Sequence, residues 1–244
     1  RPPRSTPKPS SAASDVYKRQ HEMYVVCPMM EKRGSRVYNS AVLIGRDGEY
    51  IGSYHKIHPT IGEIESGVTP GTEPKTFKVD FGVLGFAICF DLNFEDVIKG
   101  LAKDKVDLVF FPSMYPGGLQ LRIWAFNYGV HVVSAYTGEG SMIVDPLGRV
   151  LATSSFYSPI ICETLNLDCE VFHIDYNNTK WDAIKEKYGA KVKIDVSRPE
   201  AVFLLTSNIP DITVKDIAKE FQLETREEYF KRANKIRNEA LKVR

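Results

Sequence analysis

The sequence predicts an α/β protein with mixed sheets, and three patterns lead to this class. Short, almost fully apolar stretches, such as 39–44 (NSAVLI) and 106–112 (VDLVFFP), have the length and composition of buried strands. Glycine-containing turns, GRDGEY among them, join several of these stretches into hairpins. Other segments, such as 94–103 (FEDVIKGLAK), carry apolar residues at helical spacing. Strands that alternate with helices in this way are typical of α/β folds.

The first two thirds of the chain contain most of the predicted strands. Residues 60–74 hold three glycines and two prolines and are expected to form a long loop. Helices are expected at 94–103 and 119–128. Residues 24–26 are a short apolar stretch, and the predicted strands that follow are 39–44, 50–54, 77–80, 83–89, 106–112, 130–135, 141–145 and 149–152.

The region 163–244 is expected to be more peripheral, and residues 176–244 are interpreted as a C-terminal extension. Strands are predicted at 170–174, 191–196 and 201–206, and helices near 213–221 and 226–242. The last helix begins with a capping box, Thr225 to Glu228. One of its faces is expected to dock on another element, because its apolar residues recur at helical spacing: Tyr229, Phe230, Ala233, Ile236, Ala240 and Leu241.

Composition excludes several classes of protein. Lys plus Arg number 32 and Asp plus Glu 31, so the net charge of +1 lacks the basic footprint of a nucleic-acid-binding protein. No apolar run approaches the roughly 18 residues of a membrane span. Four cysteines without a CxxC pair indicate reduced thiols and a cytoplasmic location. Five scattered histidines without an HExxH motif argue against a metalloenzyme.

The first 20 residues differ sharply from the rest. They carry a net charge of +4 and four of the 14 prolines, which leaves a net charge of −3 for the other 224 residues. A targeting peptide and a disordered tail are two interpretations. A third is favoured: SSAASDVYKRQ is similar to a translated sequencing adaptor, so that the natural sequence begins near His21 and lacks its true start. Residues 1–20 are expected to be unstructured, and 21–244 to form the folded domain.

Cys89 is the first candidate for chemistry. It ends the apolar strand VLGFAIC and precedes a helix, where free amides and the helix dipole favour a thiolate and an oxyanion. Lys56 ends another strand, and a cysteine nucleophile needs a nearby positive charge or base. Glu63 and Glu65 follow Lys56 in the loop and could orient its amine. A buried core cysteine and solvated Lys56, Glu63 and Glu65 are the alternatives.

Several ordered blocks resemble the nitrilase superfamily of carbon–nitrogen hydrolases. They are YNSAVLIGRDGEYIGSYHKIHPT, GVLGFAICFDLNFED, FFPSMYPGG and SMIVDPLGRVLA, and the resemblance covers roughly residues 22–153. It implies a four-layer α-β-β-α sandwich, here without its first strand and helix, that forms homodimers or higher homo-oligomers. It implies no cofactor. The sequence CFD after the strand is similar to the amidase and N-carbamoyl branches rather than to true nitrilases.

The resemblance also assigns roles to single residues. Cys89 matches the nucleophile of a Glu–Lys–Cys triad and Lys56 its lysine, while the base glutamate, expected before the 39–44 strand, has no counterpart here. The second glutamate of the family, which contacts the lysine, is matched better by Glu65 than by Glu63. Phe90 and Tyr115 are expected to serve the oxyanion or the substrate.

These assignments predict a hydrolase that cleaves amide or N-carbamoyl C–N bonds through a cysteine thioester, with impaired turnover in this chain. Its partner would be a small-molecule substrate, with no role for nucleic acid or membrane. One alternative is a catalytically dead relative or gene fragment that only binds. Another is an unrelated Cys–His hydrolase using His55, His58 or His131. Lys56 and Cys89 are predicted to lie at the same edge of a sheet, with the amine and the sulfur within about 5 Å of each other.

Overall fold

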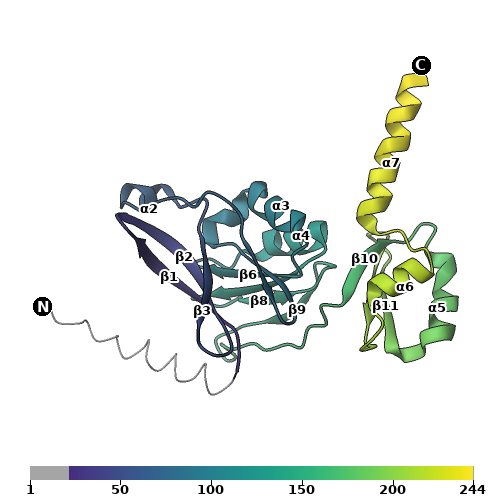
Figure 1. Ribbon diagram of the computed structural model, residues 1–244, viewed down its shortest axis with the longest axis horizontal. Coiled ribbons are helices and arrows are strands. Elements are labelled where there is room, and N and C mark those ends of the chain that lie inside the picture. Colours follow the sequence, from purple (N-terminus) through teal and green to yellow (C-terminus); the bar gives the residue numbers. More distant parts are fainter. Residues whose placement is uncertain (1–21, 244) are drawn as a thin grey trace, which may run out of the picture. The chain divides into compact units, whose positions relative to one another are not determined.

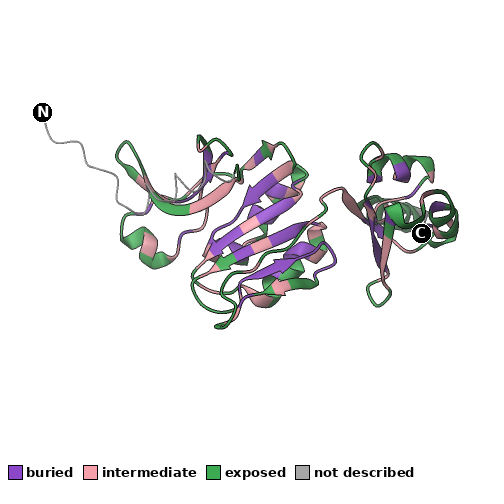
Figure 2. Cartoon of the chain, turned by 90° about the horizontal axis from the view of Figure 1, so that it is seen from below, coloured by how far each residue is buried: buried purple, intermediate pink, exposed green. Residues whose placement is uncertain are grey.

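The computed structural model describes residues 22–243, and the expectations for residues 1–20 lie outside this range. Two compact units make up the chain. The first consists of residues 22–117 and Val133–Ser141, and the second of Gly118–Val132 and 142–243. Buried residues lie mainly on strands, whereas turns are largely exposed (Figure 2).

The first unit contains a three-stranded antiparallel sheet in the order β1-β2-β3. Its strands are β1 (Val25–Arg33), β2 (Arg36–Ile44) and β3 (Tyr50–His55). The sequence marked only 24–26 as an apolar stretch, because the remaining six residues of β1, PMMEKR, mix apolar with charged side chains and are mostly exposed. The predicted Asp-Gly hairpin is confirmed, with Gly48 at φ 84°, a conformation that favours glycine.

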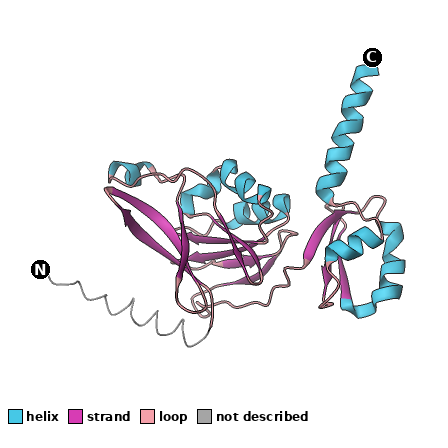
Figure 3. Ribbon diagram, viewed as in Figure 1, coloured by secondary structure: helices cyan, strands magenta, loops and turns pink. Residues whose placement is uncertain are grey.

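The second sheet of the first unit is mixed, as predicted. β4 (Thr76–Val79) and β5 (Gly82–Phe86) form an antiparallel hairpin, and β6 (Leu108–Ser113) runs parallel to β5. β6 neighbours β7 (His131–Tyr136), most of which belongs to this unit. The parallel connection from β5 to β6 passes through the 3-10 helix η1 (Cys89–Asn93) and helix α3 (Glu95–Lys103). Figure 3 colours the helices, strands and loops along the chain.

Helix α3 buries one face, as its periodicity predicts. Val97, Ile98 and Leu101 are fully buried, whereas Lys99 and Lys103 on other faces are exposed. A short helix, α2 (Ile61–Glu65), was missed because the glycine-rich region 60–74 favoured a loop. The two sheets approach closely at Gly52, where an added side-chain carbon would lie 2.5 Å from the Phe77 ring. Only glycine permits this contact.

The second unit begins with α4 (Gly118–Tyr128) and the hairpin of β8 (Met142–Val144) and β9 (Val150–Thr153). A three-stranded antiparallel sheet follows in the order β10-β12-β11. Its remaining elements are β10 (Cys169–His173), η2 (Asn178–Lys180), α5 (Trp181–Tyr188), η3 (Gly189–Lys191), β11 (Val192–Ser197), β12 (Val202–Ser207), α6 (Val214–Glu220), α7 (Arg226–Ala240) and η4 (Leu241–Val243).

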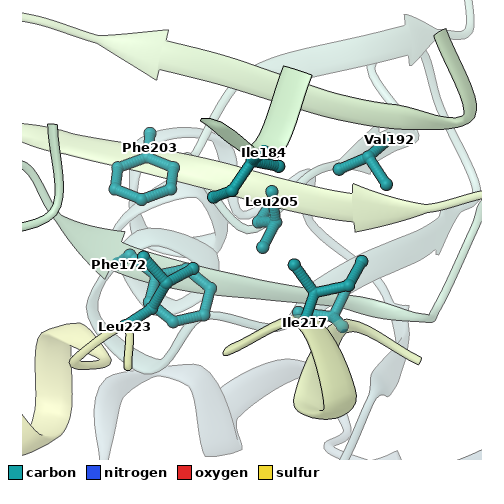
Figure 4. Close-up of a cluster of buried hydrophobic side chains, with 8 residues drawn as sticks. Phe172, Ile184, Val192, Phe203, Leu205, Ile217 and Leu223 are labelled. Carbon is teal, nitrogen blue, oxygen red and sulfur yellow. The ribbon is translucent and has the colours of Figure 1, made fainter. Parts of the chain in front are cut away.

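The C-terminal segment from β10 onward has a hydrophobic core of its own. Phe172, Phe203 and Leu205 from the sheet meet Ile184 of α5 and Ile217 of α6 (Figure 4). Each of these five side chains is fully buried. β10 and β11 are parallel with β12 between them, so α5 completes a split βαβ motif. The three strands and two helices predicted here are confirmed, and α5 was missed.

The last helix, α7, only partly fulfils the expectation that one face docks. Its capping box is present, with the Thr225 hydroxyl accepting from the Glu228 amide. Arg226 is buried and Tyr229 half-buried, but every residue from Phe230 to Lys242 is exposed. Figure 1 shows α7 extending away from β10, β11, α5 and α6.

Candidate active site

A cavity of about 680 Å³ in the first unit brings together the main residues singled out by sequence. Lys56 at the end of β3, Glu63 on α2 and Cys89 after β5 all line it. Much of the remaining lining is apolar, with Met29, Ile88, Pro112 and Met114 among its members. Lys56 and Cys89 thus line one cavity, but they follow strands of two different sheets, β3 and β5, so the expectation that they share one sheet edge is wrong. Their separation of about 5 Å stays a prediction.

Lys56 is a buried cation with a carboxylate partner. Its side chain is 2% exposed, and its Nζ donates to Glu63 Oε2 at 2.7 Å. The backbone amide of Lys56 donates to the Asn39 carbonyl of β2, which continues the strand pairing up to the site. A buried charge needs such a partner, because removing an ammonium group from water is costly. The ion pair with Glu63 thus makes it possible for the charged amine of Lys56 to be buried at the end of β3.

Glu63 is held in its ionised form by several donors. Burial acts to raise its pKa, but three groups that donate to the carboxylate outweigh burial and lower the pKa to about 2. They are the Lys56 ammonium, the Thr60 amide at 2.6 Å and the Asn39 side chain at 2.7 Å. A carboxylate with this pKa is a poor proton acceptor at neutral pH. Its contacts suit it to positioning Lys56.

The expectation that Glu65 contacts the lysine is wrong. Glu63 is the N3 residue of the capping box whose N-cap is Thr60, so its side chain turns back toward the helix start and Lys56. Glu65 lies two residues further on, about 200° around the helix, and is exposed. The sequence prediction erred because it treated this segment as a loop, in which spacing alone cannot fix a side-chain direction.

Cys89 occupies a sharp corner between β5 and η1. Its φ of 49° is in the left-handed region, which is uncommon for a residue with a side chain and costs on the order of 1 kcal/mol. The residue is only partly buried and lines the cavity. Its carbonyl accepts from the Tyr115 hydroxyl at 3.2 Å. The corner therefore holds the thiol at the cavity wall rather than in the core, against the alternative of a buried structural cysteine.

Tyr115 and Phe90 contact the corner rather than the cavity. Burial raises the pKa of Tyr115, and the nearby charges of a Cys89 thiolate and of Asp91 add to this effect. The Phe90 ring packs edge-on against Phe94 at 5.3 Å. Neither side chain belongs to the cavity lining. The roles expected for Phe90 and Tyr115 toward oxyanion and substrate remain predictions.

Asp91 is a structural link that sequence reasoning did not single out. Its carboxylate is fully buried and accepts three hydrogen bonds, from Tyr54 Oη at 2.7 Å, the His58 amide at 2.8 Å and the Ile88 amide at 2.9 Å. Tyr54 and His58 lie two residues before and two residues after Lys56, and Ile88 directly precedes Cys89. Burial raises the pKa of Asp91, although the three donors act against this. The position of Asp91, two residues after the candidate nucleophile, was the sequence signal that could have indicated this role.

An asparagine could not replace Asp91 without loss. One of its two terminal atoms is an acceptor and the other a donor. Tyr54 can reverse its hydroxyl, but the amides of Ile88 and His58 approach different carboxylate oxygens. Whichever way the amide group is turned, one buried backbone donor loses its acceptor. The Asp91 carboxylate thus joins the segment around Lys56, through the His58 amide, to the corner at Cys89, through the Ile88 amide.

The histidines lie elsewhere. His55 contacts Glu31 at 3.0 Å and stacks on Tyr38, while His58 contacts Asp96 at 3.0 Å. No histidine lines the cavity among the described residues, so the structure offers no Cys–His pair there. Within 22–243, no group of three or more His, Cys, Asp or Glu residues is arranged to hold a metal ion. None of the four cysteines, all within the described residues, forms a disulfide.

Comparison with known proteins gives a consistent result. The family model described as carbon-nitrogen hydrolase matches residues 7–168. The omega-amidase NIT3 of Saccharomyces cerevisiae is 23% identical over 164 residues, which are 57% of this chain and 56% of that protein. The deaminated glutathione amidase of Synechocystis is 28% identical over 160 residues, 54% of this chain and 59% of that protein. The chain therefore spans somewhat over half the length of these curated relatives.

Solved structures show the same fold. A mutant of the Nesterenkonia AN1 amidase from the nitrilase superfamily superposes with a TM-score of 0.54 at 21% identity, covering 58% of this chain and 61% of that one. Saccharomyces cerevisiae Nit3 gives 0.53 at 21% identity, with 63% of each chain covered. The predicted α/β sandwich of the nitrilase type is confirmed by these likenesses. Separately, no helix among the described residues has the length and apolar character to cross a membrane.

Proposed function

Because the chain belongs to the carbon–nitrogen hydrolase family, we propose that it cleaves the C–N bond of an amide or N-carbamoyl compound with Cys89 as nucleophile. The observation that carries this proposal is the shared cavity of Cys89, Lys56 and Glu63. A partly buried thiol at the cavity wall, a buried ammonium group and a carboxylate that fixes it are groups suited to acyl transfer. A homo-oligomeric assembly is part of the proposal and rests on the family resemblance.

In the proposed mechanism the Cys89 thiolate attacks the carbonyl carbon and forms a tetrahedral oxyanion. The ammonium group of Lys56 and the backbone N–H of Phe90 stabilise the negative oxygen. The C–N bond then breaks as the leaving nitrogen receives a proton, which produces a thioester on Cys89. Water attacks the thioester, releases the carboxylic acid and returns the thiol.

Proton transfer in this scheme needs a carboxylate other than Glu63. Glu63 is bound to Lys56 and has a pKa of about 2, and it is the only carboxylate among the described residues of the cavity wall. The family resemblance places the base in a segment before β2. The prediction of weak amide turnover by this chain depends on the expectation that this base glutamate has no counterpart here. The same observation favours a second candidate, a protein that binds amides without cleaving them.

A comparison of the full 244-residue chain with Cys89→Ala and Lys56→Met variants tests the proposal. Ammonia release from a panel of aliphatic amides and N-carbamoyl compounds gives the rate, and intact mass spectrometry detects the acyl thioester. Catalysis predicts a substrate-dependent mass adduct that both variants abolish. Saturable amide binding by calorimetry without adduct or ammonia would establish the binding protein. Ammonia release that persists in Cys89→Ala would refute the assignment of the nucleophile.

A further inference from the structure

The charges of the active-site cavity already balance each other. Among the described residues that line it, only Lys56 and Glu63 are charged, and they form an ion pair. Both oxygens of Glu63 are also engaged, since Oε1 accepts from the Asn39 side chain and Oε2 from Lys56 and the Thr60 amide. A charged group on a ligand would therefore enter the cavity without a free counter-charge, which is costly.

The other polar side chains of the cavity wall are neutral. The Thr60 hydroxyl caps helix α2, and the Ser113 hydroxyl accepts from the Tyr115 amide at 3.0 Å. Tyr136 and Thr137 also belong to the lining. Such groups can orient a ligand through hydrogen bonds, but they cannot balance a charge on it.

Three methionines line the opening of the cavity. Met29 and Met30 belong to β1, and Met114 follows β6, so they come from two different sheets of the first unit. They are 50%, 54% and 72% exposed. Exposed apolar side chains that gather at a cavity are typical of a binding surface, and the flexible methionine side chain adapts to the ligand that covers it.

The size of the cavity leaves room for more than a small amide. Its volume of about 680 Å³ lies within the range of sites that bind ligands of drug size. The reacting carbonyl group needs only the part of this space beside Cys89 and Lys56. The remainder, with the three methionines at its opening, suits an apolar chain of several carbons.

We propose that the substrate is an uncharged amide or N-carbamoyl compound with an apolar chain, and that Met29, Met30 and Met114 select for this chain. The inference rests on the proposed function, because it concerns the compound that Cys89 attacks. A carboxylate at the end of the chain is disfavoured for two reasons. It meets no free cation among the described residues of the wall, and it is repelled by Glu63 and by a Cys89 thiolate.

Alkylation of Cys89 in the full chain tests this preference without requiring turnover. N-hexyl iodoacetamide and N-(5-carboxypentyl) iodoacetamide have chains of equal length and differ in the charge at the end. With both, the cysteine sulfur forms a C–S bond to the CH₂ carbon as the C–I bond breaks and iodide leaves with the bonding electrons. The exposed Cys162 is the internal reference, and peptide mass mapping measures both rates. The ratio of the Cys89 rate to the Cys162 rate is expected to be at least about tenfold higher for the hexyl reagent.

Two single variants test the role of the methionines. Met114→Glu places a carboxylate at the cavity opening, and Ile51→Glu adds the same charge at an exposed position of β3 outside the cavity lining. Met114→Glu should lower the preference for the hexyl reagent about tenfold, whereas Ile51→Glu should keep it. Both should react with iodoacetamide itself as the wild type does. Circular dichroism verifies that each variant is folded.

Reversible ligands test a chain on the acyl side of the amide. Hexanamide and adipamate each have six carbons, and only adipamate ends in a carboxylate. Hexanamide is expected to protect Cys89 from iodoacetamide at a concentration about tenfold lower than adipamate. Equal protection by the two, or better protection by adipamate, would contradict the proposed substrate class.

The labelling results separate the substrate class from the proposed function. Equal rate ratios for the two reagents overturn the apolar substrate class and leave Cys89 as the nucleophile. An unchanged preference in Met114→Glu overturns the selection by the methionines. If no reagent labels Cys89 while Cys162 reacts, the assignment of the nucleophile fails, and the substrate class fails with it.

Discussion

The ion pair of Lys56 with Glu63 gives the sharpest quantitative prediction. The pKa of Glu63 is lowered from 4.5 to about 2 in the folded protein. Since one pKa unit corresponds to about 1.4 kcal/mol, this difference stabilises the folded state by up to about 3 kcal/mol at pH 7. Glu63→Gln removes the carboxylate and leaves the ammonium of Lys56, 2% exposed, without its counter-charge. We expect the free energy of unfolding to fall by about 3 kcal/mol.

The pH dependence distinguishes this ion pair from a packing effect. Because the folded pKa of Glu63 lies below the unfolded value, its contribution is fully present above about pH 4.5 and is lost as the pH falls toward 2. The difference between wild type and Glu63→Gln should shrink to about half by pH 3. Urea unfolding followed by circular dichroism at pH 7, 5, 4 and 3 measures it.

Glu65→Gln is the matched control, since Glu65 is exposed on the same short helix. It should change the free energy of unfolding by less than about 0.5 kcal/mol at every pH. A loss below about 1 kcal/mol for Glu63→Gln at pH 7 would refute the argument. So would a loss that stays constant down to pH 3, or an equal loss for Glu65→Gln.

Three further changes have defined outcomes. Asp91→Asn should lower the free energy of unfolding by about 1–3 kcal/mol in urea titrations, because one buried amide loses its acceptor; an unchanged midpoint would contradict this. Tyr115→Phe removes the hydrogen bond to the Cys89 carbonyl and should cost about 1 kcal/mol, with altered iodoacetamide labelling of Cys89 by peptide mass mapping; unchanged stability and labelling would count against it. Thr225→Ala should cost about 1 kcal/mol and speed hydrogen exchange at the start of α7, and unaltered exchange would argue against the cap.

The strands were predictable because burial dictates their composition. The stretch 39–44 falls within β2, and 130–135 matches β7 to within one residue, since apolar runs between turns leave few alternatives. The elements that were missed lack this signal. Most of β1 after Cys27 is exposed and mixes methionine with charged residues, and its strand structure is defined by its pairing with β2. Helix α2 begins two residues after Pro59, in a glycine-rich segment. Their structure depends on partners that a local pattern does not reveal.

The candidate site, too, contains residues that the sequence identified and residues that it did not. Cys89 and Lys56 were found because each follows an apolar strand, but the expected shared sheet edge was wrong, since β3 and β5 belong to different sheets. The choice between Glu63 and Glu65 depended on a capping box within a single helical turn. The role of Asp91 depends on the His58 amide and the Tyr54 hydroxyl, both more than 30 positions away, as well as on the amide of its neighbour Ile88. Spacing along the chain reveals neither the direction of the Glu63 side chain nor the donors that surround Asp91.

Asp91 also explains how the segments after β3 and β5, which belong to two different sheets, can form one site. The lysine loop after β3 and the cysteine corner after β5 belong to different sheets, so their relative position is fixed only where something connects them. The Asp91 carboxylate accepts from a backbone amide of each segment and from Tyr54 of β3. Backbone donors fix the chain itself rather than a rotatable side chain. A shift of either segment would break a charge-assisted hydrogen bond in the interior, and this cost keeps the nucleophile and the ammonium group in register.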